Sequence, residues 1–278
     1  MMKTKNTNLN MNEKVINLHY TDICNYRCRF CYARFGTTPL SLEDWKKIID
    51  HIVCDVKVKR FNLAGGEPLA APYAQGMIDY IHELGVDCSI ITNGSLLTPE
   101  FIRRNAGKVS IIGISVDGLS EEENRRLGRA DGAGRTLRRE DLVLKAAAIH
   151  EAGMRFKVNT VVNAVNCRDD FSGLIREIAP DRWKLLRMLA IEGSNDSGRD
   201  LLVSDDQFAA FAARHAALHP VVENTADIVS AYIVINPHGQ LIDNSQGRYQ
   251  ESESLLHSRF SVEFPKIAFN QEAYEKRY

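Results

Sequence analysis

Three of the six cysteines in this 278-residue chain fall within eight positions, at Cys24, Cys28 and Cys31. Thiolates are soft ligands, so three of them in one short loop favour convergence on a single metal centre. The set is one cysteine short of a closed four-thiolate site. A tetranuclear iron–sulfur cluster held by three cysteines would leave one iron open to a ligand from outside the protein. The spacing therefore indicates a [4Fe–4S] cluster with an open coordination position.

Two other uses of these cysteines stay open at this point. A structural zinc site would need a fourth ligand, which His19 or His51 could supply. Zinc sites usually pair their ligands as two close doublets, and this spacing does not. A disulfide framework is typical of small secreted domains, and this chain is far longer than those. The other cysteines are scattered, and Cys54 and Cys88, but not Cys167, sit in apolar runs typical of a core.

The overall composition argues against some classes of function. The net charge is −1, so the chain has no basic field that would favour binding to nucleic acid. No apolar run approaches the length of a membrane span. Residues 1–12 are polar and show no signal-peptide pattern, so we expect a flexible terminus and a reducing, cytoplasmic setting. We also expect a monomer.

Apolar runs and helix signals alternate along the first 200 residues. The expected strands cover residues 15–20, 58–64, 86–92, 109–116, 155–162 and 183–191. The expected helices cover residues 41–53, 72–84, a short segment from Thr98, 138–152 and 169–178. Such alternation implies parallel strands linked by crossover helices. We therefore expect an α/β fold with a partial (β/α)6 barrel over residues 13–200.

The pattern changes in the last part of the chain. A helix is expected over residues 205–218, and strands over 228–235 and 240–243 flank a turn signal. From this pattern we expect residues 201–278 to form a C-terminal extension that contains a helix, a hairpin and a tail. Earlier in the chain, residues 119–137 are polar and rich in glycine and arginine, and we expect a loop there.

Glycines and small polar residues follow several expected strands. They are Gly65, Gly66 and Glu67 after the second strand, Thr92 and Asn93 at the end of the third, and Ser115 and Asp117 at the end of the fourth. Two glycines let the backbone approach a ligand closely, and Glu67 could offer a carboxylate to an ammonium group. Working groups of barrels collect at this end of the strands, although simple strand-end capping is the alternative.

Basic residues occur within the expected strands. Lys157 and Asn159 are two positions apart and so share a face, while Lys184 and Arg60 lie on neighbouring strands. A buried cation is costly unless it is paired, and few acids lie on these strands. An anionic ligand such as a triphosphate would resolve this cost. The alternative is that these side chains lie on the outer face in solvent.

Several of these motifs resemble known families. The cysteine spacing, with Phe30 before the last cysteine, and the Gly-Gly-Glu run resemble the signatures of radical S-adenosylmethionine (SAM) enzymes. Other stretches resemble the viperin family of that superfamily, over about residues 15–243. They are Asn17–Thr21, Arg60–Pro68, Thr92–Leu96, Ile114–Asp117, Gly128–Arg129, Lys157–Asn163, Arg182–Lys184 and Ile191–Gly193.

The resemblance implies two cofactors, a [4Fe–4S] cluster held by Cys24, Cys28 and Cys31, and SAM. The implied SAM-binding residues are Phe30, Gly65, Gly66, Glu67, Thr92, Asn93, Ser115, Asp117, Arg129 and Leu189, with Arg129 expected to pair with the SAM carboxylate. The implied substrate-binding residues are Asn17 at the base, Tyr232 at the ribose, and Arg60, Lys157, Asn159, Lys184 and Arg248 at the triphosphate.

The implied reaction converts a ribonucleoside triphosphate into its 3′-deoxy-3′,4′-didehydro form, in antiviral defence. It would start with removal of the C4′ hydrogen, lose the 3′-hydroxyl as water and need an external electron donor. The base (CTP, UTP or GTP) and the proton donor stay open. One alternative is a radical SAM enzyme with another substrate, although the last third of the chain lacks cysteines for auxiliary clusters. The other is a non-enzymatic zinc-binding module.

The sequence departs from the viperin pattern in three places. Viperins often have lysine where this chain has Arg60. A basic residue of the viperin tail matches Arg248 or Tyr249 only loosely, and the tail that closes over the nucleotide is shorter than expected. The membrane-binding amphipathic helix of animal viperins has no counterpart in residues 1–12, so the chain resembles the soluble microbial branch.

Overall fold

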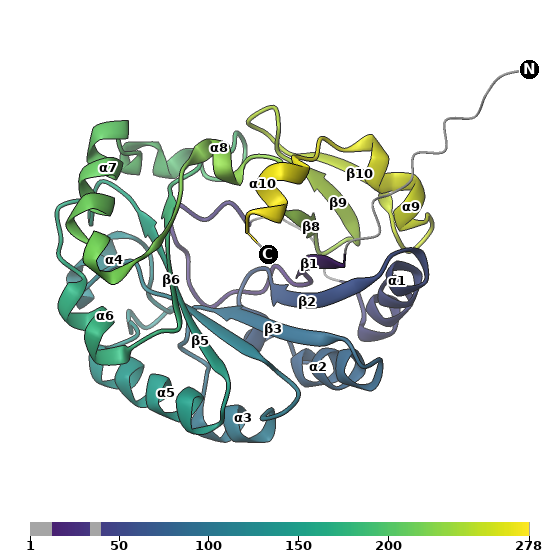
Figure 1. Cartoon of the computed structure of the whole chain (residues 1–278), viewed down its shortest axis with the longest axis horizontal. Coiled ribbons are helices and arrows are strands. Elements are labelled where there is room, and N and C mark those ends of the chain that lie inside the picture. The colour runs from purple at the N-terminus through teal and green to yellow at the C-terminus, as the bar shows by residue number, and fades with distance from the viewer. Residues whose placement is uncertain (1–12, 34–39, 278) are drawn as a thin grey trace, which may run out of the picture.

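The computed structural model describes residues 13–33 and 40–277. Ten strands form one curved sheet in the order β10-β9-β8-β1-β2-β3-β4-β5-β6-β7 (Figure 1). The strands are β1 (Lys14–His19), β2 (Val58–Ala64), β3 (Asp87–Thr92), β4 (Ile111–Ser115), β5 (Arg155–Val162), β6 (Arg182–Arg187), β7 (Val221–Glu223), β8 (Ile233–Ile235), β9 (Gln240–Asp243) and β10 (Gln250–Ser254). Strands β1 to β7 pair in parallel in chain order, and this confirms the expected partial barrel of six β/α units.

Helices cover the outer, convex face of the sheet (Figure 1). The α-helices are α1 (Leu42–Asp55), α2 (Ala74–Glu83), α3 (Pro99–Arg104), α4 (Glu121–Arg126), α5 (Arg139–Glu151), α6 (Ser172–Ile178), α7 (Asp205–Arg214), α8 (Thr225–Ile228), α9 (Phe260–Glu263) and α10 (Gln271–Glu275). Short 3-10 helices are η1 (Pro68–Ala70), η2 (Asp196–Leu201), η3 (Ala216–Leu218) and η4 (Phe264–Lys266). The core lies between these helices and the outer side of the strands, so the inner side remains for a ligand.

Helix α1 illustrates how the sequence specifies this layer. Ser41 caps its N-terminus, and the hydroxyl accepts a hydrogen bond from the amide of Asp44 at 3.2 Å. Trp45, Ile48 and Ile52 recur at helical spacing and are fully buried against the sheet. Burial of each such side chain contributes about 1.5–3 kcal/mol, so this single face fixes the helix on the sheet.

Some expected boundaries are wrong. The expected loop over residues 119–137 contains α4, which begins with a capping box between Ser120 and Glu123. Strand β6 ends at Arg187 instead of residue 191. The expected strand over residues 228–235 starts only at Ile233, because α8 ends at Ile228.

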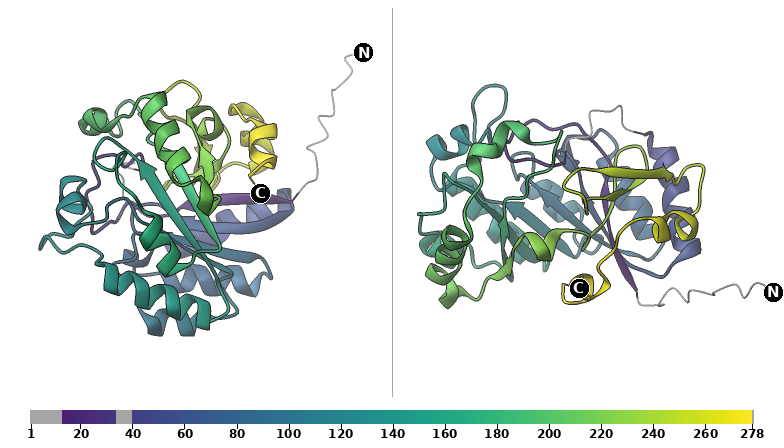
Figure 2. Two further views of the ribbon diagram at one scale, coloured as in Figure 1. Left: turned by 60° about the vertical axis from the view of Figure 1, so that its left-hand side comes forward. Right: turned by 90° about the horizontal axis from the view of Figure 1, so that it is seen from above.

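The C-terminal extension does not form a separate layer. Its strand β7 adds to one edge of the barrel next to β6, while β8 joins the other edge next to β1. Strands β8 and β9 form the expected antiparallel hairpin. The hydroxyl of Tyr274 accepts a hydrogen bond from the amide of Val15 at 2.5 Å, which places the C-terminus beside the start of β1 (Figure 2).

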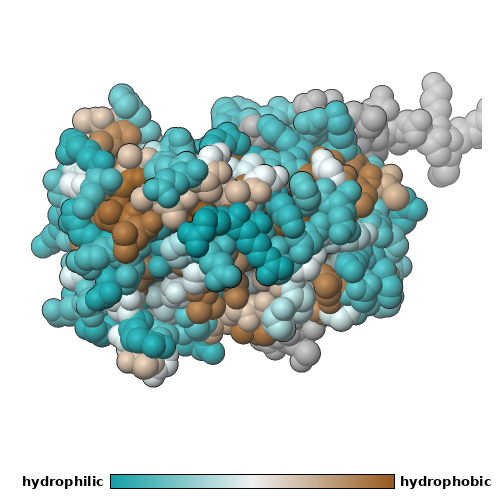
Figure 3. Space-filling model, turned by 90° about the horizontal axis from the view of Figure 1, so that it is seen from below, coloured by the Kyte–Doolittle hydropathy of each residue, from teal (hydrophilic) through white to brown (hydrophobic). Residues whose placement is uncertain are grey.

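One face of the outer surface is mostly polar (Figure 3). Figure 3 shows one face on which hydrophilic residues surround separate, small apolar areas. Within the described residues, the helices are all too short or too polar to cross a lipid bilayer. The expected flexible segment of residues 1–12 lies outside the described residues.

Candidate active site

Residues from each of the strands β1 to β6 line one cavity of about 510 Å³. The cavity contains two chemical regions. Its lining at the carboxyl ends of the strands includes Cys24, Cys28, Phe30, Cys31, Gly65, Gly66, Thr92, Asn93, Ser115, Asp117, Arg129 and Leu189. Its lining further down includes Asn17, Arg60, Asn62, Ser89, Lys157, Asn159, Arg182, Lys184, Tyr232 and Arg277. The structure thus brings together almost all of the site residues expected from the sequence.

The cysteine loop is fixed by backbone hydrogen bonds to the segment after α4. The amide of Arg27 donates to the carbonyl of Gly128 at 3.0 Å, and the amide of Arg29 donates to the carbonyl of Leu127 at 2.9 Å. Gly128 has a φ of +74°, and a Cβ atom there would lie 2.2 Å from the carbonyl oxygen of Arg27. Glycine is therefore required for the two segments to approach this closely.

The three thiols suit an iron–sulfur cluster better than a single metal ion. All three line the same cavity, and none forms a disulfide. Burial raises the pKa of Cys28 to about 12, with smaller contributions from Cys31 and Cys24 because their thiols lie close by. Among residues 13–33 and 40–277, no three His, Cys, Asp or Glu side chains converge closely enough to hold one metal ion. A [4Fe–4S] cluster takes one thiolate per iron, so three thiols that line one cavity fit three of its four irons.

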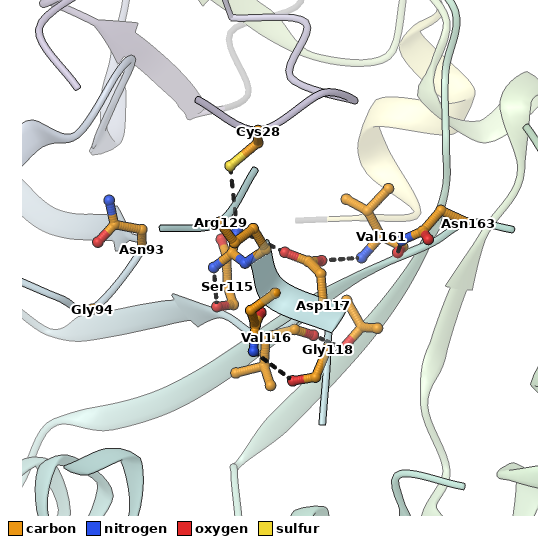
Figure 4. Close-up of polar contacts among 12 residues, drawn as sticks. Cys28, Asn93, Gly94, Ser115, Val116, Asp117, Gly118, Arg129, Val161 and Asn163 are labelled. Atoms are coloured by element: carbon orange, nitrogen blue, oxygen red, sulfur yellow. Dashed lines mark hydrogen bonds and ion pairs between the residues drawn. The ribbon is translucent and has the colours of Figure 1, made fainter. Parts of the chain in front are cut away.

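A buried ion pair lies beside the cysteine loop (Figure 4). The guanidinium of Arg129 lies 2.8 Å from the Asp117 carboxylate and donates to the carbonyl of Ser115 at 2.7 Å. It also lies 3.8 Å from the sulfur of Cys28. Burial raises the pKa of Asp117, and the positive charge of Arg129 opposes this shift. Asp117 therefore already balances Arg129, which the sequence led us to expect beside a SAM carboxylate.

The Gly65–Gly66 turn packs against the chain just before the cysteines. The amide of Gly66 donates to the carbonyl of Thr21 at 2.7 Å, and that of Glu67 donates to the carbonyl of Ile23 at 2.7 Å. A Cβ atom at Gly66 would lie 2.4 Å from the carbonyl oxygen of Ile23. The glycines thus allow β2 and the cysteine loop to meet at the rim of the cavity.

Glu67 differs from our expectation. Its side chain is fully buried and does not line the cavity. The carboxylate accepts hydrogen bonds from the Thr92 hydroxyl at 2.6 Å and from the amide of Asn93 at 2.7 Å. These bonds satisfy the buried charge, so Glu67 holds the end of β3 in place instead of offering its carboxylate to an ammonium group.

Three polar side chains form a relay across the inner face of β1, β2 and β3. Asn17 donates to the carbonyl of Ile233 at 3.0 Å, Asn62 donates to Asn17 at 2.8 Å, and Ser89 donates to Asn62 at 2.8 Å. A backbone carbonyl can only accept, so it fixes the orientation of the Asn17 amide and, in turn, of the Asn62 amide. Asn17, the expected base-contacting residue, is therefore held rigidly at the cavity wall.

The lower region of the cavity is positively charged. Arg60, Lys157 and Lys184 all line it, which makes the alternative of an outer, solvated face wrong. Arg182 lines it too. Burial lowers the pKa of Lys157 well below its ordinary value, and the neighbouring charges of Lys184 and Arg182 lower it further. An anionic ligand would reverse that repulsion.

Two of the expected cations have acidic partners that sequence reasoning missed. Arg60 lies 3.5 Å from the Asp87 carboxylate of β3, and Lys184 forms an ion pair with Glu223 of β7. Neither acid lies on β2, β5 or β6, the strands that carry the cations, so the expectation of few acids on those strands is confirmed and the partners come from β3 and β7. Glu223 was missed because β7 has three residues and no clear strand signal in the sequence.

The basic residue that the C-terminal tail contributes to the cavity wall is Arg277, and not Arg248 as expected. Arg248 is exposed and does not line the cavity, although its neighbour Tyr249 does. Arg277 is buried, lines the cavity, and its guanidinium lies 3.8 Å from the ring centroid of Tyr232. Arg277 lies near the end of a tail that we expected to be polar, so the sequence did not indicate that its side chain is buried.

Comparisons with known proteins identify the family. Residues 18–178 match the family described as the radical SAM superfamily. A protein of Selenomonas ruminantium named S-adenosylmethionine-dependent nucleotide dehydratase is 32% identical over 95% of this chain and 98% of its own length. The chain belongs to the radical SAM superfamily and, within it, to the family of S-adenosylmethionine-dependent nucleotide dehydratases. It therefore uses a [4Fe–4S] cluster and SAM, as expected from the sequence, and the zinc-binding module is excluded.

Two further relatives carry the same name. One from Lacinutrix mariniflava is 33% identical over 87% of this chain, which spans 52% of that protein's length. One from Danio rerio, named S-adenosylmethionine-dependent nucleotide dehydratase RSAD2, is 30% identical over 87% of this chain and 70% of its own length. These relatives confirm the resemblance to the viperin family.

Solved structures confirm the fold. Streptococcus suis SuiB bound to its precursor peptide SuiA has a TM-score of 0.70 at 14% identity, over 95% of this chain and 66% of SuiB. Native anSMEcpe with bound AdoMet and a Cp18Cys peptide has a TM-score of 0.68 at 13% identity, over 95% of this chain and 82% of anSMEcpe. At this identity the similarity concerns the arrangement of strands and helices alone.

Proposed function

We propose that this protein converts a ribonucleoside triphosphate into its 3′-deoxy-3′,4′-didehydro form in antiviral defence. One observation supports this most: a cavity with three cysteines at one end has a buried cationic region at the other. A triphosphate is the small ligand that would best neutralise such a region. The shared name of the relatives, nucleotide dehydratase, supports the same class of substrate.

We propose that Cys24, Cys28 and Cys31 hold the cluster. When bound, the reduced cluster and SAM supply the radical chemistry that removes the C4′ hydrogen atom of the ribose, after which the 3′-hydroxyl leaves as water. The residues proposed to hold SAM are Phe30, Gly65, Gly66, Thr92, Asn93, Ser115, Asp117, Arg129 and Leu189. Glu67 supports this set indirectly, because it holds Thr92 and Asn93 in position.

The proposed triphosphate ligands are Lys157, Lys184, Arg60 and Arg182. Asn159 lies opposite Lys184 in the register of β5 and β6, and so belongs to the same end of the cavity. We assign Tyr232 to the ribose. The task of these residues is to orient the nucleotide with C4′ toward the cofactors, since correct positioning accounts for a large part of enzymatic rate enhancement.

The base would lie against the relay of Asn17, Asn62 and Ser89. The Asn17 oxygen accepts from the Asn62 amide nitrogen, so Ser89→Ala would keep the orientation of Asn62 but leave its oxygen without the hydroxyl that donates to it. We expect this change to alter the ratio of kcat/KM values among CTP, UTP and GTP. If the ratio does not change, the relay does not determine which base is preferred.

The remaining parts of the proposal concern partners and setting. The C-terminal extension would close over the nucleotide, because β7, β8 and Arg277 lie beside the cationic region. An external reductant would deliver electrons to the cluster. The protein would act as a monomer in the cytoplasm.

Anaerobic turnover tests the function. Reconstituted protein, SAM and dithionite are incubated with each nucleoside triphosphate, and 5′-deoxyadenosine and the nucleotide product are measured by mass spectrometry. At least one nucleotide should increase 5′-deoxyadenosine release and lose the mass of one water. If none does, the proposed substrate class is wrong.

A pair of variants places the nucleotide. Lys157→Met removes a cavity-lining cation and should raise the nucleotide KM. Lys145→Met removes a partly buried lysine of the outer helix α5 and should leave KM unchanged. Equal KM values for both variants would place the triphosphate elsewhere.

A further inference from the structure

Glu223, the last residue of β7, joins three separate parts of the cationic region. Its carboxylate forms ion pairs with Lys184 of β6 and with Arg277 of the C-terminal tail, the latter at 3.1 Å. It also accepts a hydrogen bond of 2.5 Å from the hydroxyl of Tyr232, just before β8. The Glu223 side chain is 5% exposed. A single buried carboxylate therefore connects both edges of the barrel to the tail.

Arg277 is engaged mainly by the protein itself. Its guanidinium donates to both carboxylate oxygens of Glu223 at 3.1 Å. It also donates to the carbonyl of Ala231 at 2.6 Å and to that of Asp227. A guanidinium has five N–H donors, so at least four are committed to these acceptors. Arg277 thus fastens the tail to the barrel and stacks on the ring of Tyr232.

Lys184 is engaged differently. Its ammonium group has three N–H donors, of which one contacts Glu223 and one contacts the hydroxyl of Tyr232 at 3.1 Å. Among the contacts of the described residues, this leaves one donor of Lys184 for a ligand in the cavity that it lines. The carboxylate therefore determines where Lys184 points its remaining donor.

We propose that Glu223 is a positioning residue for the triphosphate, which it serves by holding Lys184, Tyr232 and Arg277 at the substrate end of the cavity. This inference rests on the proposed function. Burial of a carboxylate between cations is costly unless every partner is well placed, and Glu223 meets that condition through four contacts. Loss of its charge would leave Lys184 and Arg277 buried without a counter-charge.

The charge of Glu223 also sets the protonation of Lys184. Burial lowers the pKa of Lys184 to about 8, and the Glu223 carboxylate opposes this shift. The other charged groups that act on Lys184 are Arg277 and Arg182, which lower its pKa. Lys157 on the neighbouring strand β5 adds a further positive charge. Without the carboxylate, Lys184 would lose its proton at a lower pH than it does in the unmodified protein.

The variant Glu223→Gln tests this role, because it keeps the shape and removes the charge. We expect KM for the nucleotide to rise about fivefold at pH 8, since a fall of one unit from a pKa of about 8 leaves about a tenth of Lys184 protonated there instead of about a half. The rise of KM with pH should begin at lower pH in the variant than in the unmodified enzyme, while kcat at saturating nucleotide changes less than twofold. Glu223→Asp, which keeps the charge, should recover part of the loss.

A matched control is Glu263→Gln. Glu263 is also buried and paired with a lysine, Lys266 at 2.8 Å. It lies in α9, and Lys266 does not line the cavity, whereas the partners of Glu223 do. This variant should keep the KM and pH profile of the unmodified enzyme. An equal change in both variants, or a Glu223→Gln variant whose KM stays the same or falls, would overturn the inference.

Binding of inorganic tripolyphosphate, measured by calorimetry on cluster-loaded protein, separates this inference from the proposed function. Glu223→Gln should weaken this binding about fivefold at pH 8, whichever reaction the enzyme catalyses. Equal affinity for tripolyphosphate overturns the role of Glu223. An unmodified enzyme that responds to no nucleotide overturns the proposed function instead.

Discussion

Replacement of Gly128 by alanine should disturb the cysteine loop without touching a cysteine. Gly128 has a φ of +74°, and its added Cβ would lie 2.2 Å from the carbonyl oxygen of Arg27 and 3.3 Å from the Cα of Cys28. An ordinary contact begins at 3.4 Å, so the loop would have to move by about 1.2 Å. The obstacle is backbone, which cannot turn aside as a side chain can.

Two costs add up in this variant. Alanine in a left-handed backbone conformation costs roughly 1–2 kcal/mol of folding free energy. The displaced loop also loses the hydrogen bonds of Arg27 and Arg29 to the Gly128 segment, at about 0.5–1.5 kcal/mol each. A shift of about 1 Å in a catalytic group lowers activity by about a hundredfold. We therefore expect Gly128→Ala to bind less iron and to cleave SAM about a hundredfold more slowly.

Gly134 offers a matched control. Its φ is +75°, but a Cβ atom there would meet no other atom within 4 Å. Gly134→Ala thus reproduces the backbone strain without the collision. Iron content, visible absorbance after anaerobic reconstitution and 5′-deoxyadenosine release are measured for both variants. If Gly128→Ala matches Gly134→Ala in all three, contact with the cysteine loop does not position the cluster.

Two further variants probe the cofactor end of the cavity. Asp117→Asn removes the counter-charge of the buried Arg129 and should lower the free energy of unfolding by about 3–5 kcal/mol, measured by urea denaturation. A loss below about 1 kcal/mol would show that another group balances the charge of Arg129. Thr92→Val removes the hydroxyl that donates to Glu67 and should cost about 1.5–3 kcal/mol. Because Thr92 also lines the cavity, this variant should weaken SAM binding in calorimetry, and unaltered binding would contradict the role assigned to the end of β3.

The sequence predicted the cavity wall well because strand periodicity is a local property. Residues two apart on a strand share a face, so the spacing of Lys157 and Asn159 was enough to place them together. Four residues of the barrel rim, Cys28, Thr92, Ser115 and Asp117, followed from the rule that parallel strands end at one edge. The register of neighbouring strands then brought these groups to one cavity.

The missed features depend on contacts between distant parts of the chain. Glu223 and Arg277 are 54 positions apart, and no pattern within either segment indicates that they meet in the barrel. We expected the Glu67 carboxylate to contact an ammonium group of a ligand, because the sequence alone does not show that it bonds to Thr92 and Asn93. Helix α4 was missed although its signal is local. The Ser120–Glu123 capping box is present in the sequence, but the glycines and arginines around it led us to expect a loop.

The pairing of β8 with β1 affects how this protein can mature during synthesis. The first strand leaves the ribosome long before Ile233, which pairs with Ile16 on one side of it, and before Tyr274, which bonds to Val15. One edge of β1 therefore stays open until β8 has been made, and an open strand edge can pair with other chains. The part of the cavity wall that Tyr232 and Val234 contribute is therefore completed only after the cysteine loop and strands β1 to β7 have been made.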